Sequence, residues 1–239
     1  MASVFITGSG VRIGRGLALR FAQDGWDVAV HYNSSAEEAQ KTVDEIKDIG
    51  REVALVQSDV RDYGEVERSF KKAVDKIGIP NVIVNNAGVF PPPTSLGELD
   101  EKQWNDVVNI NLRGEFFFSK VFAEYAKKNS RIINISSLGA IKIWKQRIPY
   151  NVSKAGVVQL TKALARDLAP NIAVNSVCPG AIIVEGEPSE NDKYLAPEGK
   201  IPMKRYGNVN DIYDAVSFFA NCSIYITGQV ICVDGGFSL

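Results

Sequence analysis

The chain has one histidine and three cysteines among 239 residues, and this scarcity limits the sites it can build. With His31 as the only histidine, a histidine-centred catalytic triad or a zinc site is nearly excluded, and we predict no metal. The cysteines Cys178, Cys222 and Cys232 form no Cys-x-x-Cys pair. Scattered thiols of this kind are typical of a protein from a reducing compartment.

Long apolar runs and an excess of charge are also missing. No run reaches the roughly 18 residues of a membrane span, and no signal peptide precedes the first apolar run. The formal net charge is −1, which argues against nucleic acid or an anionic membrane as the main partner. We expect a cytoplasmic protein that acts on a small molecule.

Short apolar runs alternate with longer amphipathic stretches along the chain. Most runs are rich in Val and Ile at consecutive positions, as in strands buried on both faces. The expected strands are 3–7, 27–32, 52–57, 81–86, 131–136, 172–177 and 229–233. The expected helices are 14–24, 35–49, 62–77, 103–128, 150–168 and 209–221. This alternation predicts a single α/β domain over residues 1–239, a Rossmann fold whose doubly wound parallel sheet has about seven strands and helices on both faces.

The segment 179–205 interrupts this alternation. It mixes Gly, Pro and charged residues and has no apolar period. Such composition predicts a loop, and its place after the sixth expected strand puts it beside the carboxyl ends of the sheet. We expect a substrate loop here.

The first strand-to-helix turn reads TGSGVRIG over residues 7–14. Gly8 can take the tight turn out of the strand, and Gly14 allows close packing of the helix. Free N–H groups at the start of that helix can then bind a pyrophosphate. In the first βα unit of a doubly wound fold, this turn predicts a dinucleotide site.

The second expected strand ends in HYNSS, with no acid over 31–36. An acid near this point usually binds the ribose 2′-hydroxyl of NAD. The hydroxyls of Ser34 and Ser35, the Asn33 amide and the Arg12 cation would instead suit a 2′-phosphate. NADP(H) is therefore the predicted cofactor.

Tyr150 and Lys154 lie four residues apart, on one face of an expected helix. A neighbouring ammonium stabilises a phenolate and so assists proton transfer near neutral pH. A hydroxyl of Ser136 or Ser137, at the end of the fifth expected strand, could hydrogen-bond a substrate carbonyl. Asn111 is unusual inside a helix, and it either satisfies neighbouring backbone or holds a water in a proton relay.

Together these residues resemble the short-chain dehydrogenase/reductase superfamily over essentially the whole chain. The matching motifs are, in order, the Thr-Gly turn at 7–14, Asp59-Val60, NNAG at 85–88, Asn111 in NINLRG, Ser137, YNVSK at 150–154, PG at 179–180 and YITGQVICVDGG at 225–236. The resemblance implies hydride transfer between NADP(H) and a small-molecule substrate.

The resemblance also implies a role for each motif residue. Tyr150 would be the general acid/base, Ser137 would orient the carbonyl, Lys154 would bind the nicotinamide ribose, and Asn111 would hold the relay water. The predicted cofactor-binding residues are Gly8, Arg12, Ile13, Gly14, Tyr32, Asn33, Ser34, Ser35, Asp59, Val60, Asn86, Ala87, Gly88, Tyr150, Lys154, Pro179, Gly180 and Ile182. A homodimer or homotetramer through helices 103–128 and 150–168 is implied as well.

Two positions depart from the usual pattern, Arg12 in place of glycine and Val184 in place of threonine. Pteridine reductases of the superfamily are similar in the first respect, and they carry a pterin-stacking aromatic where Phe90 stands. The parasite enzymes have an aspartate in place of Ser137. A pterin-like ring and a simple carbonyl, such as a 3-oxoacyl thioester, therefore both stay open as substrates.

An acyl-carrier-protein substrate would favour a basic entrance to the site. The basic residues flanking the expected mouth are Lys142, Lys145, Arg147, Lys204 and Arg205, although surface solvation more often explains such residues. A more remote alternative is a non-catalytic NADP(H) sensor. Such a protein would be expected to lose Tyr150 or Lys154, and this chain retains both.

Overall fold

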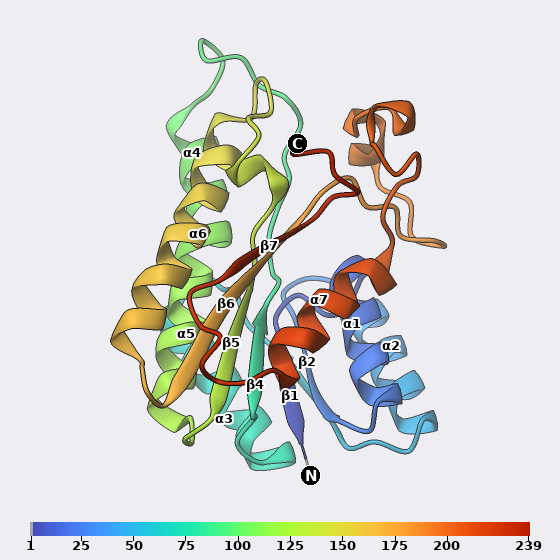
Figure 1. Cartoon of the computed structure of the whole chain (residues 1–239). Coiled ribbons are helices and arrows are strands. Elements are labelled where there is room, and N and C mark those ends of the chain that lie inside the picture. The colour runs from blue at the N-terminus through green and yellow to red at the C-terminus, as the bar shows by residue number, and fades with distance from the viewer. Residues whose placement is uncertain (1) are drawn as a thin grey trace.

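Seven strands form one parallel sheet in the order β3-β2-β1-β4-β5-β6-β7, in a computed structural model that describes residues 2–239 (Figure 1). The strands are β1 (Ser3–Ile6), β2 (Asp27–Tyr32), β3 (Val53–Gln57), β4 (Val82–Asn85), β5 (Ser130–Ile135), β6 (Ile172–Pro179) and β7 (Val230–Val233). Each lies within two residues of its expected bounds. The predicted doubly wound Rossmann sheet is confirmed.

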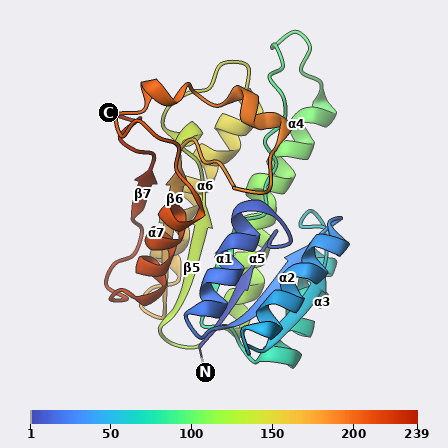
Figure 2. The same ribbon diagram turned by 90° about the vertical axis from the view of Figure 1, so that its right-hand side faces the viewer.

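Helices cover both faces of this sheet (Figures 1 and 2). They are α1 (Arg12–Gln23), α2 (Ala36–Asp48), α3 (Tyr63–Ile77), α4 (Glu101–Val108), α5 (Gly114–Tyr125), α6 (Ile148–Asp167) and α7 (Val209–Asn221). One hydrophobic core unites the sheet with α1, α2 and α7, and a second unites it with α3, α5 and α6. Within residues 2–239, no helix has the length and apolarity to cross a membrane.

The central strand β1 shows why the strand sequences are apolar at consecutive positions. Val4 and Ile6 point into the first core, and Phe5 points into the second. The Phe5 ring packs against the rings of Phe70 and Phe118, with centroids 5.2 and 5.4 Å apart. Because both faces are covered, alternation of apolar and polar residues is absent.

The expected helix 103–128 is divided into three parts. A π-helical turn over Asn109–Arg113 separates α4 from α5. Single π-turns are frequent at functional sites, where they redirect one side chain. Here the turn contains Asn111, whose amide bonds the backbone of Val89 outside the helix. A helical period in the sequence cannot reveal one inserted residue.

The segment 179–205, predicted to be a substrate loop and called by that name below, folds across the carboxyl ends of the strands (Figure 2). It contains two short 3₁₀ helices, η3 (Glu190–Tyr194) and η4 (Glu198–Lys200). The Asn191 side chain donates a 2.7 Å hydrogen bond to the carbonyl of Phe90 on the loop after β4. The loop is therefore bound to the rest of the domain.

Candidate active site

A cavity of about 750 Å³ opens at the carboxyl ends of the strands. It lies where β1 sits between β2 and β4, the point at which the strand order reverses and doubly wound folds bind ligands. The predicted residues that line it are Gly8, Arg12, Ile13, Gly14, Tyr32, Asn33, Ser34, Ser35, Asp59, Val60, Asn86, Ala87, Gly88, Phe90, Ser137, Tyr150, Lys154, Pro179, Gly180 and Ile182. Of the predicted site residues, Asn111 alone lies outside this lining.

The glycine turn depends on the close approach of its neighbours. Gly8 has a φ of +62°, and a Cβ there would lie 2.9 Å from the Cα of Ala87. A Cβ on Gly14 would lie 2.1 Å from the carbonyl oxygen of Gly8. No other residue type fits at either position without displacing backbone. The predicted tight turn and close helix approach are thus both present.

His31 supports this turn by a hydrogen bond to its backbone, a role that the sequence did not indicate. Its Nδ1 accepts a 3.1 Å hydrogen bond from the Gly8 N–H, while Nε2 lies 2.9 Å from the Ser58 hydroxyl. Burial lowers the pKa of His31 to about 4. The imidazole is therefore neutral at physiological pH, as its acceptor role at Nδ1 requires.

Arg12 points toward the substrate loop. Its guanidinium donates to the Glu187 carbonyl at 2.6 Å and to the Asp192 carboxylate at 3.1 Å. Its backbone φ is +52°, a left-handed conformation that favours glycine, which accounts for the glycine usual at this position in the superfamily. The side chain was expected beside a 2′-phosphate, and the structure instead binds it to the loop. Its contact with a 2′-phosphate stays a prediction.

An anion already occupies the start of α1. The Glu187 carboxylate accepts from the Arg12 backbone N–H and, at 3.3 Å, from the Arg15 guanidinium. Helix N-termini attract anions because their first N–H groups are free and the helix dipole is positive there. Glu187 shows that this turn accommodates a negatively charged group, as the pyrophosphate of a dinucleotide requires.

Three of the predicted catalytic side chains line one wall of the cavity. Ser137 follows β5, and its Oγ accepts a 3.0 Å hydrogen bond from the Gly139 N–H. Tyr150 lies in the first turn of α6, with its ring 4.6 Å from that of Phe90. Lys154 lies one turn further along the same helix face.

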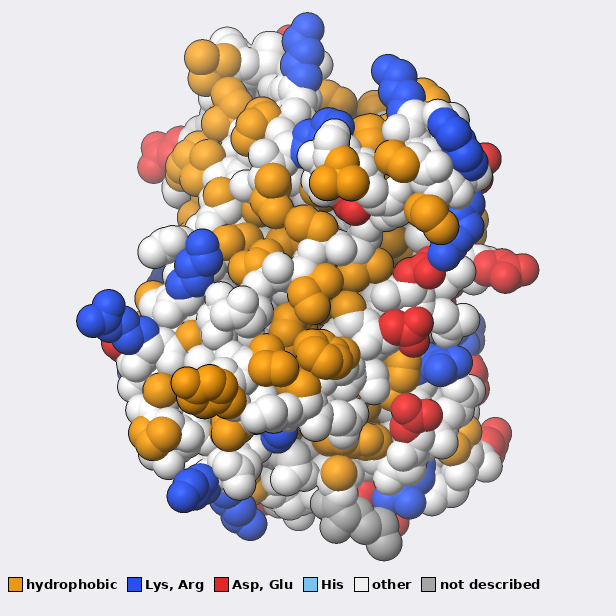
Figure 3. Space-filling view, viewed as in Figure 1, with side chains coloured by type: hydrophobic (Ala, Val, Ile, Leu, Met, Phe, Trp, Pro, Cys, Tyr) orange, Lys and Arg blue, Asp and Glu red, His pale blue; other side chains and the backbone are white. Residues whose placement is uncertain are grey.

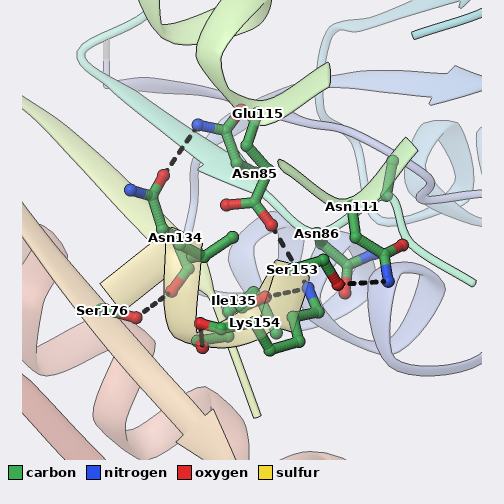
Figure 4. Close-up of polar contacts among 12 residues, drawn as sticks. Asn85, Asn86, Asn111, Glu115, Asn134, Ile135, Ser153, Lys154 and Ser176 are labelled. Atoms are coloured by element: carbon green, nitrogen blue, oxygen red, sulfur yellow. Dashed lines mark hydrogen bonds and ion pairs between the residues drawn. The ribbon is translucent and has the colours of Figure 1, made fainter. Parts of the chain in front are cut away.

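The Lys154 ammonium is held in place by two buried acceptors (Figure 4). Its Nζ lies 2.7 Å from the Ile135 carbonyl and 3.3 Å from the Glu115 carboxylate. Burial raises the pKa of Glu115 to about 8, against the opposing effect of Lys154. Glu115 was not predicted, because one acid in an amphipathic helix resembles any solvated side chain.

Asn111 ties the loop after β4 to helix α6 (Figure 4). Its Oδ1 accepts from the Val89 N–H at 2.7 Å, and its Nδ2 donates to the Val89 carbonyl at 2.9 Å and to Ser153 at 3.3 Å. Of the two roles considered for this residue, satisfaction of neighbouring backbone is present. The relay water stays a prediction.

A row of polar side chains runs across three neighbouring strands of the sheet. Asn85, Asn134 and Ser176 occupy matching positions on β4, β5 and β6. The Asn85 side-chain amide donates a 2.8 Å hydrogen bond to Oδ1 of Asn134. The Ser176 hydroxyl donates to the backbone carbonyl of Asn134 at 3.0 Å (Figure 4). These bonds fix the strand ends from which the site residues project.

Several aromatic side chains also line the cavity. Its lining includes Phe90, Trp144, Tyr194 and Phe237. Trp144 and Phe237 are stacked, with centroids 6.0 Å apart. Except for Phe90, these residues were not predicted, since they come from loops with no pattern.

The basic entrance considered from the sequence does not form as one group. Arg147 is only 3 % exposed and lies inside the cavity wall. Arg205 pairs with Asp211 at 2.7 Å, and neither it nor Lys204 belongs to the described lining. Lys142 donates to the Phe237 carbonyl at 2.8 Å. Lys145 remains exposed at the mouth.

Comparison with known proteins identifies the family. A family model described as Enoyl-(Acyl carrier protein) reductase matches residues 10–238. The 3-oxoacyl-acyl-carrier-protein reductase FabG of Staphylococcus aureus is 38 % identical, over 98 % of this chain and 97 % of its own. The chain belongs to the short-chain dehydrogenase/reductase family.

Solved structures agree with this assignment. A short-chain dehydrogenase/reductase of Serratia marcescens superposes with a TM-score of 0.92 at 31 % identity, over 100 % of this chain and 98 % of that one. A blue fluorescent protein from a metagenomic library, in complex with NADPH, has a TM-score of 0.91 at 33 % identity with the same coverage. A Burkholderia cenocepacia short-chain dehydrogenase in complex with NADP has a TM-score of 0.92 at 30 % identity, again with the same coverage. The protein is an oxidoreductase of the kind that uses a nicotinamide cofactor.

We predict that Glu115→Gln changes how stability depends on pH. The pKa of Glu115 is raised from its ordinary value of 4.5 to about 8, so the unfolded chain releases this proton at lower pH than the folded protein. Wild type should therefore lose stability relative to the variant as pH rises from about 4.5 to 8, with no further change above. Urea unfolding of both proteins between pH 5 and 9 measures this difference. A difference that is constant over the range would contradict the prediction.

Proposed function

We propose that this protein is an NADPH-dependent reductase that transfers hydride to the carbonyl carbon, or a pterin-like C=N carbon, of a small substrate. One observation carries the proposal: Ser137, Tyr150 and Lys154 line the same cavity as the glycine turn. The turn fits a dinucleotide for two reasons. The backbone around Gly14 leaves no room for a side chain, and the N-terminus of α1 already binds a carboxylate.

The residues of the chain have distinct tasks in this reaction. The Ser137 hydroxyl donates to the substrate oxygen and orients it. Tyr150 gives its proton to the same oxygen as the carbon is reduced, and the Lys154 ammonium stabilises the phenolate that remains. Bound NADPH supplies the hydride. Asn111 positions the loop that follows β4. Glu115 positions the Lys154 side chain.

The choice of NADPH rests on the end of β2. Residues 31–36 contain no carboxylate, and Asn33, Ser34 and Ser35 line the cavity. The helix that follows begins at Ala36, and its N-terminus favours a phosphate. Two similar solved structures are named as complexes with NADPH or NADP. These facts support NADP(H) over NAD(H).

A 3-oxoacyl thioester on an acyl-carrier protein is the second candidate substrate, favoured by relatives of that activity at 38 % identity. The pterin-like substrate is favoured by Phe90, whose ring lies beside Tyr150. The basic entrance that an acyl-carrier protein would favour is reduced here, since Arg147 is buried and Arg205 is paired.

An oligomer built on α5 and α6 completes the proposal. Phe116 on α5 and Val152 on α6 are 42 % and 45 % exposed. Apolar side chains are also numerous on the face that carries α7 and β7, where Phe218 is half-exposed (Figure 3). Burial of such side chains favours association.

Tyr150→Phe should lower the rate of reduction at least about 100-fold, because general acid catalysis contributes roughly 10²–10⁴-fold. NADPH binding, followed by fluorescence, should persist. The panel of substrates is dihydropterin, quinonoid dihydropterin, acetoacetyl thioester and simple diketones. Tyr225→Phe is the matched control, since Tyr225 is 94 % exposed. Wild-type turnover by Tyr150→Phe would contradict the catalytic assignment.

Ser34→Asp should raise the KM for NADPH about tenfold or more while changing that for NADH little. The new carboxylate would repel a 2′-phosphate, and two charges 4 Å apart near a surface interact by up to about 4 kcal/mol. Ser34→Asn is the neutral control at this exposed position. Arg12→Ala belongs in the same series, and an equal effect on both cofactors would separate Arg12 from the 2′-phosphate. A Ser34→Asp enzyme that keeps its cofactor preference would contradict the proposed site.

Sedimentation velocity should show a dimer or tetramer for wild type at micromolar concentration. The double substitution Phe116→Glu with Val152→Glu should shift the protein to smaller species, since it buries two charges in the proposed interface. Phe218→Glu, on the α7 face, reports whether that surface takes part instead. A wild-type monomer would overturn the proposed assembly.

A further inference from the structure

The wall of the cavity contains a buried cation without a hydrogen-bond partner. Arg147 is the residue before α6, three positions ahead of Tyr150, and it is 3 % exposed. Both terminal nitrogens, Nη1 and Nη2, are buried and make no hydrogen bond within the described part of the chain. The side chain lines the same cavity as Ser137 and Tyr150.

Aromatic rings rather than carboxylates surround this guanidinium. Its central carbon lies 3.9 Å from the centroid of the Phe90 ring and 4.8 Å from that of Tyr194. Cation–π contacts of this kind stabilise a charge but satisfy few of its five N–H donors. Burial lowers the pKa of Arg147, but a guanidinium still stays charged at physiological pH.

An acid that lines the same cavity already has another partner. Asp192 lines the same cavity, but its carboxylate is bound by Arg12 at 3.1 Å. Within residues 2–239, no carboxylate forms an ion pair with Arg147. A buried and unpaired charge is costly, so an arrangement of this kind is expected where a ligand supplies the missing anion.

We infer that Arg147 binds a carboxylate of the substrate, which makes the substrate an oxo acid with its acid group a few bonds from the carbonyl. This inference rests on the proposed reductase function and specifies its substrate class. A guanidinium presents its donors in a planar fork that matches a carboxylate in two parallel hydrogen bonds. The Phe90 ring contacts both Arg147 and Tyr150, so the acid group would lie one ring away from the catalytic hydroxyl.

The test compares oxo acids with their neutral esters, which keep the carbon skeleton. The pairs are acetoacetate with methyl acetoacetate, and levulinate with methyl levulinate. Wild type should prefer each acid by about tenfold or more in kcat/KM, as expected for a hydrogen-bonded charge pair. Arg147→Met should remove most of this preference, and Arg147→Lys should keep only part of it, since lysine lacks the planar fork.

Lys145→Met is the matched control. Lys145 lies two residues away at the mouth of the same cavity, but it is exposed and solvated. It should retain the acid preference within about twofold, because solvent screens an exposed charge. A preference lost equally in Lys145→Met and Arg147→Met would assign it to the general charge of the mouth and would overturn the inference.

Binding of benzoate and benzamide in the presence of NADPH gives a readout without turnover. Calorimetry should show tighter binding of benzoate by wild type and loss of that difference in Arg147→Met. Reduction of acids and esters at equal rates, with equal binding of benzoate and benzamide, would overturn the role of Arg147 while leaving the reductase intact. Absence of NADPH-dependent turnover with every carbonyl would refute the proposed function, and selective benzoate binding would still support Arg147 as a carboxylate site.

Discussion

The buried ammonium of Lys154 is the contact on which the active site depends. It links α6 to the end of β5 through the Ile135 carbonyl and to α5 through Glu115. Those bonds fix the rotation of α6, and with it the position of Tyr150 one turn earlier. Because a buried charge is costly without partners, the ammonium is stable only where these acceptors converge. The helix, the strand and the proposed catalytic tyrosine are thereby placed by one polar cluster.

A second set of polar contacts joins the cofactor turn to the substrate loop. Arg12 and Arg15 bind Glu187 and Asp192 across the start of α1. A ligand pyrophosphate at this helix start would compete with the Glu187 carboxylate for the same N–H group. The position of the loop is therefore expected to respond to an occupied cofactor site. The same loop also contacts Phe90 through the Asn191 side chain and Arg147 through the Tyr194 ring.

The residues that line the cavity fall into two groups of different chemistry. The first, beside β1 and β2, has backbone N–H groups, hydroxyls and glycines, which suit phosphates and sugars. The second, beyond Tyr150, has aromatic rings around one buried cation, which suits a compact substrate with an anionic group. Ser137, Tyr150 and Lys154 line the same cavity as both groups of residues, as the proposed transfer between two bound molecules requires.

The alternation of buried runs and amphipathic helices was sufficient to predict the fold, since strands covered on both faces are apolar at consecutive positions, as Phe5 and Ile6 are. Gly8, Gly14 and the Tyr150–Lys154 pair could likewise be found from the sequence, because local spacing sets their geometry. The positions of Glu115, His31 and Arg147 could not, because each acquires its role from residues distant in sequence. The direction of the Arg12 side chain was also decided by the tertiary structure, where its guanidinium donates to the Asp192 carboxylate, 180 residues away in the sequence. Local periodicity determines which elements form, whereas the burial and pairing of single charges depend on how those elements pack.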